Sequence, residues 1–401
     1  MDLSERGAHL VTQSVCRQQR LPRTCTYARH PDFQRDRLVD GILRHLRADV
    51  HRGISCEEAR PVQRSARARL WPQHRRPREA VTTQIDVSVI IAAWRAGAFI
   101  DKAIASALAS TGVALEVIVV DDASPDDTFA VLSRIASSDQ RVTALKLEKN
   151  SGPSGARNRA IEIARGRYVA VLDADDVMGP GRLADLVALA DRHDADIAVD
   201  NMLNVDEAGA TLADNPFLKS TEFAKDRTID LATWIRCNNP MSGGDTLGYL
   251  KPVIRRAKLL ESGIAYDTAL RNSEDYYLIA DLLAANAKMV YTPSTGYLYT
   301  RSSSSTSYRL KPEQTQAWLS AEARFTARHG AQLTVEERAA QAIRKRTLRN
   351  VDNLVAVTDA LKARKLVKTT RLLASDLPGA AYTLGTLTKV AAGKALGRKL
   401  V

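Results

Sequence analysis

Between residues 86 and 180, short apolar runs alternate with segments whose apolar residues recur at helical spacing. The apolar runs are rich in β-branched residues, which is typical of strands buried on both faces; they span 87–94, 115–124, 142–148 and 168–176. The helical spacing predicts helices over 98–110, 126–137 and 151–165. Such alternation indicates βαβ units, and right-handed crossovers then give an α/β fold with a mainly parallel, doubly wound sheet.

The second half of the chain alternates less regularly. The pattern predicts, in order, a helix over 182–194, a strand over 196–206, turns and a strand within 242–254, a helix over 273–286 and one or two strands within 287–301. After Tyr308 the chain is expected to be mostly helical, with Trp318 and Phe325 in the core. Residues 1–80 show poor apolar periodicity apart from a short helical pattern over 37–50, so we expect a largely disordered extension there.

Charge divides the chain into three parts. The net charge of the 401 residues is +12, but residues 1–80 and 361–401 each carry +8, which leaves −4 for residues 81–360. Because the body is mildly acidic, nucleic-acid binding is disfavoured. We therefore predict an Arg-rich extension (1–80), a globular domain (81–310, with halves 81–180 and 181–310) and a helical, basic C-terminal region (311–401). One hypothesis is that residues 1–80 derive from an upstream start codon.

Several features bear on location. Cys16, Cys25 and Cys56 lack the close paired spacing of a zinc site. No stretch approaches 18 uninterrupted apolar residues, and the N-terminus has no secretory apolar segment. We expect a cytoplasmic protein. Its basic tail, Lys362 to Lys399, is either a solvated helix or a peripheral contact with anionic membrane, since clustered Lys and Arg are attracted to that surface.

Carboxylates follow two of the predicted strands. Asp121 and Asp122 end one strand, and Asp173, Asp175 and Asp176 end another. In an open parallel sheet, ligands bind beyond the carboxyl ends of the strands, so both clusters face one crevice. A single such Asp is often a turn residue or a cap; two acidic strand ends together favour a ligand site. The clustered charge needs compensation, for which we expect Mn²⁺ or Mg²⁺ completed by substrate phosphates.

Two further segments carry candidate chemistry. In "SEDYY", Glu274 and Asp275 begin a predicted helix, where ordinary capping with Ser273 is the alternative. In "NSGPSGARNRA" (150–160), glycines let the backbone approach a ligand and Arg157 lies near a helix N-terminus. This loop lacks the Lys-Ser/Thr ending of a P-loop, which argues against a P-loop NTPase.

Together, "VSVIIAAW", "LEVIVVDDAS", "NSGPSGARNRA" and "YVAVLDADD" resemble the nucleotide-sugar-binding half of family 2 glycosyltransferases, which adopt the GT-A fold. The resemblance is close over 86–180 and continues more loosely to residue 310 through "KPVIRR", "SEDYYL" and "YLYTR". Within the family, the chain is most similar to bacterial enzymes that extend exopolysaccharides, of the succinoglycan-assembly kind.

The resemblance implies a nucleotide-binding side of the site. Ala92, Ala93 and Trp94 would border the nucleoside, although Trp94-Arg95 stands where the family often has Tyr-Asn. Asp122 would contact the base, most often uracil.

The resemblance also implies residues for the reaction itself. Arg157 and Asp173 would face the diphosphate, and Arg301 would lie where the family closes over it. Asp173 and Asp175 match the D-x-D metal site for Mn²⁺ or Mg²⁺. Asp275 matches the catalytic base, with Glu274 beside it.

The function implied is inverting, metal-dependent transfer of a hexose from a nucleotide-diphosphate sugar, with a UDP-sugar as the expected donor, to a glycan or lipid-linked oligosaccharide. Processive relatives carry Q-x-x-R-W and transmembrane helices; both are absent here, so we expect one sugar per encounter. The first alternative is a non-catalytic nucleotide- or glycan-binding protein of the same fold. A two-component receiver domain is disfavoured because its acid pair follows the first strand, whereas here the pair follows the second.

Overall fold

The computed structural model describes residues 84–240, 244–301 and 310–395. The extension predicted for residues 1–80, its short helix over 37–50 and the three cysteines before residue 60 lie outside the described residues.

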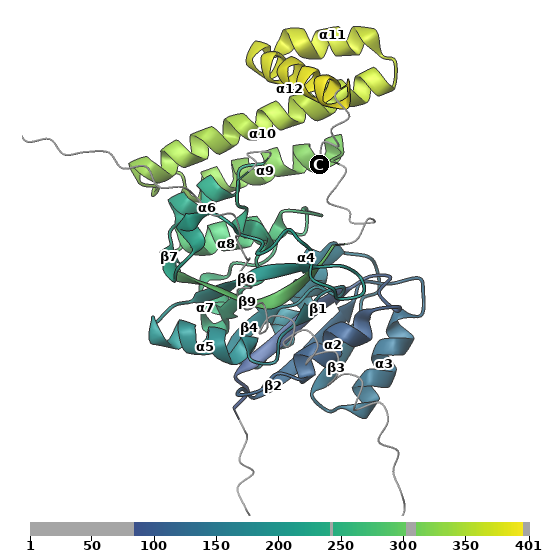
Figure 1. The fold of residues 1–401 in the computed structure, drawn as a ribbon, viewed down its shortest axis with the longest axis vertical. Coiled ribbons are helices and arrows are strands. Elements are labelled where there is room, and N and C mark those ends of the chain that lie inside the picture. The colour runs from purple at the N-terminus through teal and green to yellow at the C-terminus, as the bar shows by residue number, and fades with distance from the viewer. Residues whose placement is uncertain (1–83, 241–243, 302–309, 396–401) are drawn as a thin grey trace, which may run out of the picture.

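A single nine-stranded sheet forms the centre of the described chain, in the order β3-β2-β1-β4-β8-β6-β9-β5, with β7 paired to β9 off this path (Figure 1). The strands are β1 (Val87–Ala93), β2 (Leu115–Asp121), β3 (Val142–Lys146), β4 (Tyr168–Val171), β5 (Val177–Met178), β6 (Ile197–Val205), β7 (Arg227–Ile229), β8 (Val253–Arg255) and β9 (Met289–Thr300).

The first half of the sheet confirms the predicted parallel α/β arrangement. β1 pairs in parallel with β2 and with β4, and β2 pairs in parallel with β3. The connections are α2 (Ile100–Leu108), α3 (Thr128–Ser138) and α4 (Gly152–Ile163). β4 is shorter than predicted, because it ends at Val171 and leaves the acidic cluster in the turn that follows.

The second half of the sheet is mixed. β8 lies antiparallel between β4 and β6, whereas β6 and β9 are parallel. The helices of this half are α5 (Arg182–Arg192), η1 (Thr221–Phe223), α6 (Leu231–Cys237), η2 (Leu247–Tyr249), α7 (Arg256–Ser262) and α8 (Glu274–Ala284). The antiparallel β8 has a functional consequence, since its first residues lie beside the carboxyl end of β4.

The described chain after the sheet is mostly helical, as predicted, and its helices are α9 (Pro312–His329), α10 (Val335–Lys362), α11 (Leu366–Ser375) and α12 (Leu377–Ala395). Trp318 and Phe325 are buried, which confirms them as core residues. Figure 1 shows α9 and α10 over α6 and α8, with α11 and α12 at the end farthest from β2 and β3. The division into domains near residue 310 stays a prediction.

A buried arginine fixes α10 to the body. The Arg344 guanidinium lies 3.6 Å from the ring centroid of Tyr276 and donates to Glu322 on α9 and to the Asn238 carbonyl. The C-terminal helices are therefore packed against the same helix, α8, that begins with Glu274 and Asp275. In the described part of the chain, no helix combines the length and apolar character that crossing a bilayer requires.

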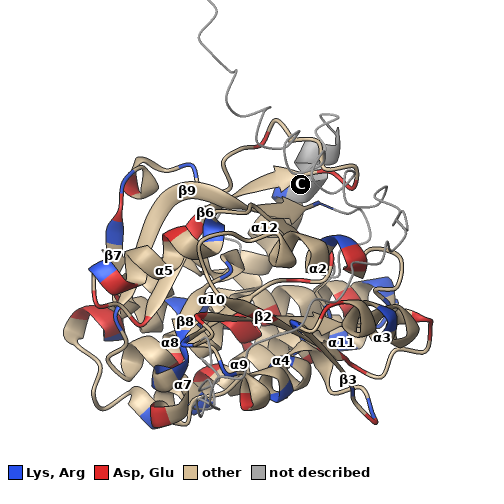
Figure 2. Cartoon of the chain, turned by 90° about the horizontal axis from the view of Figure 1, so that it is seen from below, with Lys and Arg blue, Asp and Glu red and all other residues tan. Residues whose placement is uncertain are grey.

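Charge is distributed as expected for a sheet covered on both sides. Figure 2 shows Lys, Arg, Asp and Glu mainly on helices and connecting loops, while the strands carry few of them. A few charged side chains are buried, and each of them needs a partner of opposite charge or a hydrogen bond.

Candidate active site

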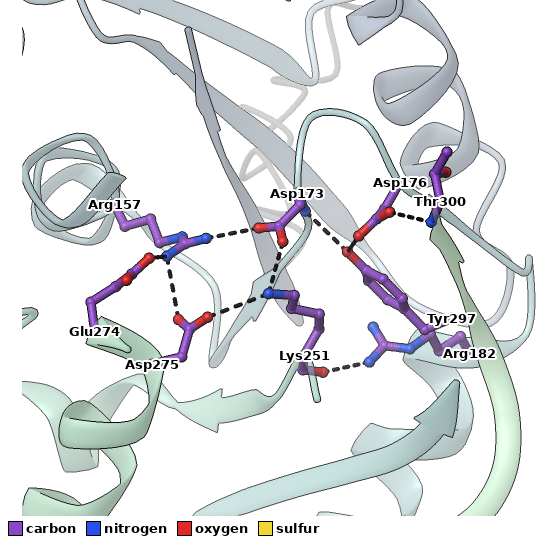
Figure 3. A network of polar contacts seen from close by, with 9 residues as sticks. All are labelled: Arg157, Asp173, Asp176, Arg182, Lys251, Glu274, Asp275, Tyr297 and Thr300. Carbon is purple, nitrogen blue, oxygen red and sulfur yellow. Dashed lines mark hydrogen bonds and ion pairs between the residues drawn. The ribbon is translucent and has the colours of Figure 1, made fainter. Parts of the chain in front are cut away.

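The carboxyl end of β4, the start of β8 and the N-terminus of α8 meet in a network of buried charges (Figure 3). Arg157, on α4, is at its centre. Its Nη2 donates to Asp173 Oδ1 at 2.7 Å, and its Nη1 donates to Glu274 Oε1 at 2.8 Å and to Asp275 Oδ1 at 3.3 Å. Three carboxylates from segments more than a hundred residues apart thus share one guanidinium.

Lys251 is the second cation of this network. Its ammonium lies 2.8 Å from Asp173 Oδ2 and 3.3 Å from Asp275 Oδ2. Burial disfavours the charged ammonium, but Asp173 and Asp275 more than offset this and raise the pKa of Lys251. Both Arg157 and Lys251 therefore bridge the same two aspartates.

The sheet register explains why Lys251 reaches Asp173. Ala170 of β4 is paired with Val253 of the antiparallel β8, and Val171 N–H donates to the Pro252 carbonyl. Lys251, two residues before β8, is thereby placed opposite the first residues after β4.

A second buried ion pair holds the Lys251 backbone in place. Arg182 donates to both oxygens of Asp200 at 2.8 to 3.1 Å and also to the Lys251 carbonyl. The Arg182 guanidinium lies 5.0 Å from the ring centroid of Tyr297 on β9. One arginine therefore supports both Lys251 and Tyr297 from below (Figure 3).

Tyr297 in turn fixes the acidic turn after β4. Its hydroxyl accepts from the backbone N–H of Asp173 at 3.1 Å and donates to Asp176 Oδ2 at 2.7 Å. The Asp176 Oδ1 accepts from the backbone N–H of Thr300 at 2.7 Å. Burial and the charges of Asp173 and Asp175 raise the pKa of Asp176. Both oxygens of Asp176 are thus used to hold the turn in place.

The negative charge of Asp173 is compensated by protein side chains. The sequence led us to expect that a divalent cation would do this, but Arg157 and Lys251 already lie beside its carboxylate. Burial disfavours ionisation of Asp173, yet Lys251 and Arg157 outweigh it and lower its pKa to about 2. The sequence pattern indicated Arg157 as a site residue but not its ion pair with Asp173, and it missed Lys251, which comes from the start of β8.

Asp175 differs from its neighbours. No hydrogen bond or ion pair joins its carboxylate to another described residue. Although Asp175 lies at the surface, partial desolvation by its surroundings and the Asp173 charge raise its pKa. Nowhere in the described chain do three or more His, Cys, Asp or Glu side chains form a metal cage. Mg²⁺ commonly takes only one or two carboxylates and completes its shell with substrate phosphates. Asp175 fits that arrangement, whereas Asp173 would have to exchange a contact with Arg157 or Lys251.

Glu274 and Asp275 do not act as simple helix caps. Ser273 precedes α8 with a left-handed backbone (φ 61°) and forms no side-chain cap hydrogen bond. Glu274 is buried, and burial raises its pKa, while its carboxylate holds Arg157. The Asp275 side chain is 14% exposed and that of Asp173 is 24% exposed, so a substrate can reach both.

The residues expected to border the nucleoside lie at the ends of β1 and β2. Ala92 and Ala93 end β1, and Trp94 follows them with 51% of its surface exposed. Asp122 is buried, and its two oxygens accept from the backbone N–H groups of Ser151 (2.6 Å) and Gly152 (2.8 Å) at the start of α4. Burial raises the Asp122 pKa.

Arg301 lies at the opposite side of the site. It directly follows Thr300, whose backbone N–H holds Asp176, and its own N–H donates to the Val205 carbonyl. The structure therefore brings Arg157, Asp173, Glu274 and Asp275 into direct contact, with Asp175 adjacent. Ala92, Ala93, Trp94, Asp122 and Arg301 lie around this centre on neighbouring segments.

Comparison with known proteins relates this chain to sugar-transferring enzymes. The profile of the family "Glycosyl transferase family 2" matches residues 88–277. "Succinoglycan biosynthesis protein ExoO" of Rhizobium meliloti is 35% identical over 291 residues, which cover 73% of this chain and 82% of that protein. "Succinoglycan biosynthesis protein ExoU" of the same organism is 39% identical over 215 residues, 53% of this chain and 61% of that protein.

Among solved structures, S. aureus TarS 1–349 in complex with UDP-GlcNAc has a similar fold. Its TM-score is 0.50 at 18% identity, covering 73% of this chain and 91% of that chain. The similarity concerns the fold alone, and it confirms the expected GT-A architecture.

Proposed function

Since this chain belongs to glycosyl transferase family 2, we propose that it transfers one hexose, with inversion, from a nucleotide-diphosphate sugar to a glycan or lipid-linked oligosaccharide during polysaccharide biosynthesis. UDP is the proposed nucleotide. The observation that carries this proposal is the pair of cations, Arg157 and Lys251, shared by two partly exposed aspartates. In this arrangement Asp275 can accept a proton and Asp173 can face the diphosphate, and each carboxylate has positive charge beside it.

In the proposed reaction, Asp275 accepts the proton of the acceptor hydroxyl as its oxygen attacks the anomeric carbon. The new C–O bond forms on one face of the sugar while the bond to the diphosphate oxygen breaks on the other, as in other inverting displacements at this carbon. The bonding electrons leave with the nucleoside diphosphate. Arg157 and Lys251 offset negative charge around this centre, and Glu274 keeps Arg157 in position.

A Mn²⁺ or Mg²⁺ ion bound with the donor would act as a Lewis acid toward the leaving diphosphate. Asp175 would hold it, and Asp173 would join only by releasing Arg157 or Lys251.

A donor screen tests the proposal directly. Nucleotide sugars are incubated with the protein with and without Mn²⁺, and hydrolysis and thermal stabilisation are measured. We expect one UDP-sugar to be hydrolysed in a Mn²⁺-dependent manner. Stabilisation without any turnover, even with glycan acceptors, would favour the non-catalytic binding alternative.

Replacing Asp175 with asparagine is expected to weaken Mn²⁺ binding in the presence of UDP by at least about tenfold, because it removes the carboxylate that has no protein partner. Titration calorimetry measures the affinity. Asp185→Asn, on the exposed side of α5, is the matched control. Equal Mn²⁺ affinity in both variants would remove Asp175 from the metal site.

We further propose that α11 contacts an anionic membrane, as expected of an enzyme with a lipid-linked acceptor. Leu366 and Val367 are 67% and 75% exposed at its start. Lys368 and Arg371 are exposed on the adjoining side of the helix. Exposed apolar side chains beside basic ones on the same helix suit the interface of a bilayer that contains anionic lipid.

Lys368→Glu combined with Arg371→Glu is expected to abolish co-sedimentation with phosphatidylglycerol vesicles at low salt. Each Lys or Arg near such a surface contributes about 1 kcal/mol, and the substitutions reverse the charge. The control, Lys102→Glu with Arg134→Glu, makes the same change on α2 and α3. If both double variants sediment equally, α11 is not the contact.

A further inference from the structure

Three aromatic side chains converge beside the charged network from segments far apart in the chain. Phe217 lies in the loop after β6, Tyr249 in η2 and Tyr299 on β9. Their ring centroids are 5.7 Å (Phe217–Tyr249), 6.1 Å (Phe217–Tyr299) and 6.3 Å (Tyr249–Tyr299) apart. The ring planes are inclined to one another by 56°, 80° and 59°, so the rings do not stack face to face. We call the group formed by Phe217, Tyr249 and Tyr299 the aromatic corner.

Strand geometry places this aromatic corner on the same side of the sheet as the acidic turn. Tyr297 and Tyr299 are two residues apart on β9, so their side chains point to the same face. Tyr297 contacts Asp173 and Asp176. Tyr249 is two residues from Lys251, and the charges of Asp176 and Lys251 act on the Tyr299 hydroxyl, whose pKa burial raises.

The corner is partly exposed at the surface. Tyr249 is 39% exposed, and Phe217 and Tyr299 are partly buried. No described residue hydrogen-bonds to the hydroxyl of Tyr249 or Tyr299. The site therefore offers apolar ring faces together with two hydroxyl groups, which is the combination that an amphipathic, ring-shaped ligand requires.

The sheet order separates this corner from the nucleoside side. Ala92, Ala93 and Trp94 lie at the end of β1, whereas the corner is built on β6 and β9, on the other side of β4 and β8. A base bound at β1 and β2 would leave the corner for the other substrate. A pyranose ring has an apolar face of axial C–H groups and an equatorial rim of hydroxyls, which matches the aromatic faces and the two tyrosine hydroxyls.

We propose that Phe217, Tyr249 and Tyr299 form a saccharide-binding subsite that holds a pyranose ring of the acceptor beside the Asp173–Lys251–Asp275 network. This inference rests on the proposed function and specifies the acceptor side of it. The subsite recognises the ring of a sugar and not one particular hydroxyl group. The acceptor is therefore expected to have a pyranose ring next to the hydroxyl group that reacts.

The test uses saturation-transfer NMR on the full-length protein with cellobiose as the probe. We expect transfer to the axial ring protons of cellobiose, reduced at least threefold in Tyr249→Ala and in Phe217→Leu. Tyr382→Ala, which removes a half-buried tyrosine on α12, is the matched control and should keep the signal. Tyr249 is exposed enough that its removal should leave the thermal unfolding temperature nearly unchanged.

The possible outcomes separate this inference from the proposed function. No cellobiose signal with the wild-type protein, or an equal signal in Tyr249→Ala and Tyr382→Ala, would overturn the saccharide subsite. A loss of UDP binding in Tyr249→Ala with the cellobiose signal intact would also overturn it and assign the corner to the donor. Failure of the donor screen, with no nucleotide sugar bound or hydrolysed, would instead reject the proposed function.

Discussion

Asp275→Asn should reduce turnover by a factor of about one hundred or more, the scale for losing a general base. The amide has nearly the same shape but cannot accept the proton of the acceptor hydroxyl. In the wild-type protein both carboxylate oxygens of Asp275 accept from a cation. The asparagine therefore also directs its –NH₂ group toward Arg157 or Lys251. The rate of sugar transfer and the dissociation constant of the donor nucleotide should be measured together, since donor binding is expected to persist.

Asp267→Asn is the control for this experiment. Asp267 precedes α8 in the same segment but pairs with Arg324 on α9, away from the network. Wild-type turnover in Asp275→Asn would exclude Asp275 as the base. A comparable loss in both variants would point to a structural effect of the segment.

Lys251→Met should lower the free energy of unfolding by about 3–5 kcal/mol, because removing one partner of a buried ion pair leaves an uncompensated charge. Here two partners, Asp173 and Asp275, would face each other with only Arg157 between them. Denaturant unfolding measures the change. Transfer should fall at least a hundredfold, since both carboxylates lose the group that sets their separation.

The matched variant is Lys258→Met. Lys258 is a half-buried lysine of the same region, on α7, but its ammonium donates to the Ala285 carbonyl and lies outside the network. Equal unfolding free energies for the two methionine variants would show that Lys251 is not the compensating charge inferred from its contacts. A stable Lys251→Met protein with full activity would remove it from the site.

Local sequence signals were sufficient for the elements of the first half. The β-branched runs at Val87–Ala93 and Leu115–Asp121 became central strands because strands buried on both faces are continuously apolar. The weak elements, such as β7 and α7, are short and owe their conformation to tertiary packing, so no period marks them in the sequence. The length of β4 was overestimated because apolar residues continue to Leu172 after its pairing ends.

The candidate site was predictable where acids end a strand or begin a helix. Asp173 and Asp275 stand at such positions, and they meet in the structure. Lys251 was missed because only the antiparallel pairing of β8 with β4 brings it to Asp173, and a local pattern contains no information on that pairing. Arg182 and Tyr297 were missed for a related reason, since each acts by supporting another residue.

Two cations shared by Asp173 and Asp275 make the two halves of the site energetically dependent on each other. If donor binding breaks the contact of Asp173 with Lys251 or Arg157, that cation interacts with Asp275 alone. Donor binding therefore changes the electrostatic environment of the acceptor site. Such coupling is reciprocal, so the acceptor must alter donor affinity by the same factor. Cooperative binding of the donor and the acceptor would then be a property of these shared ion pairs themselves.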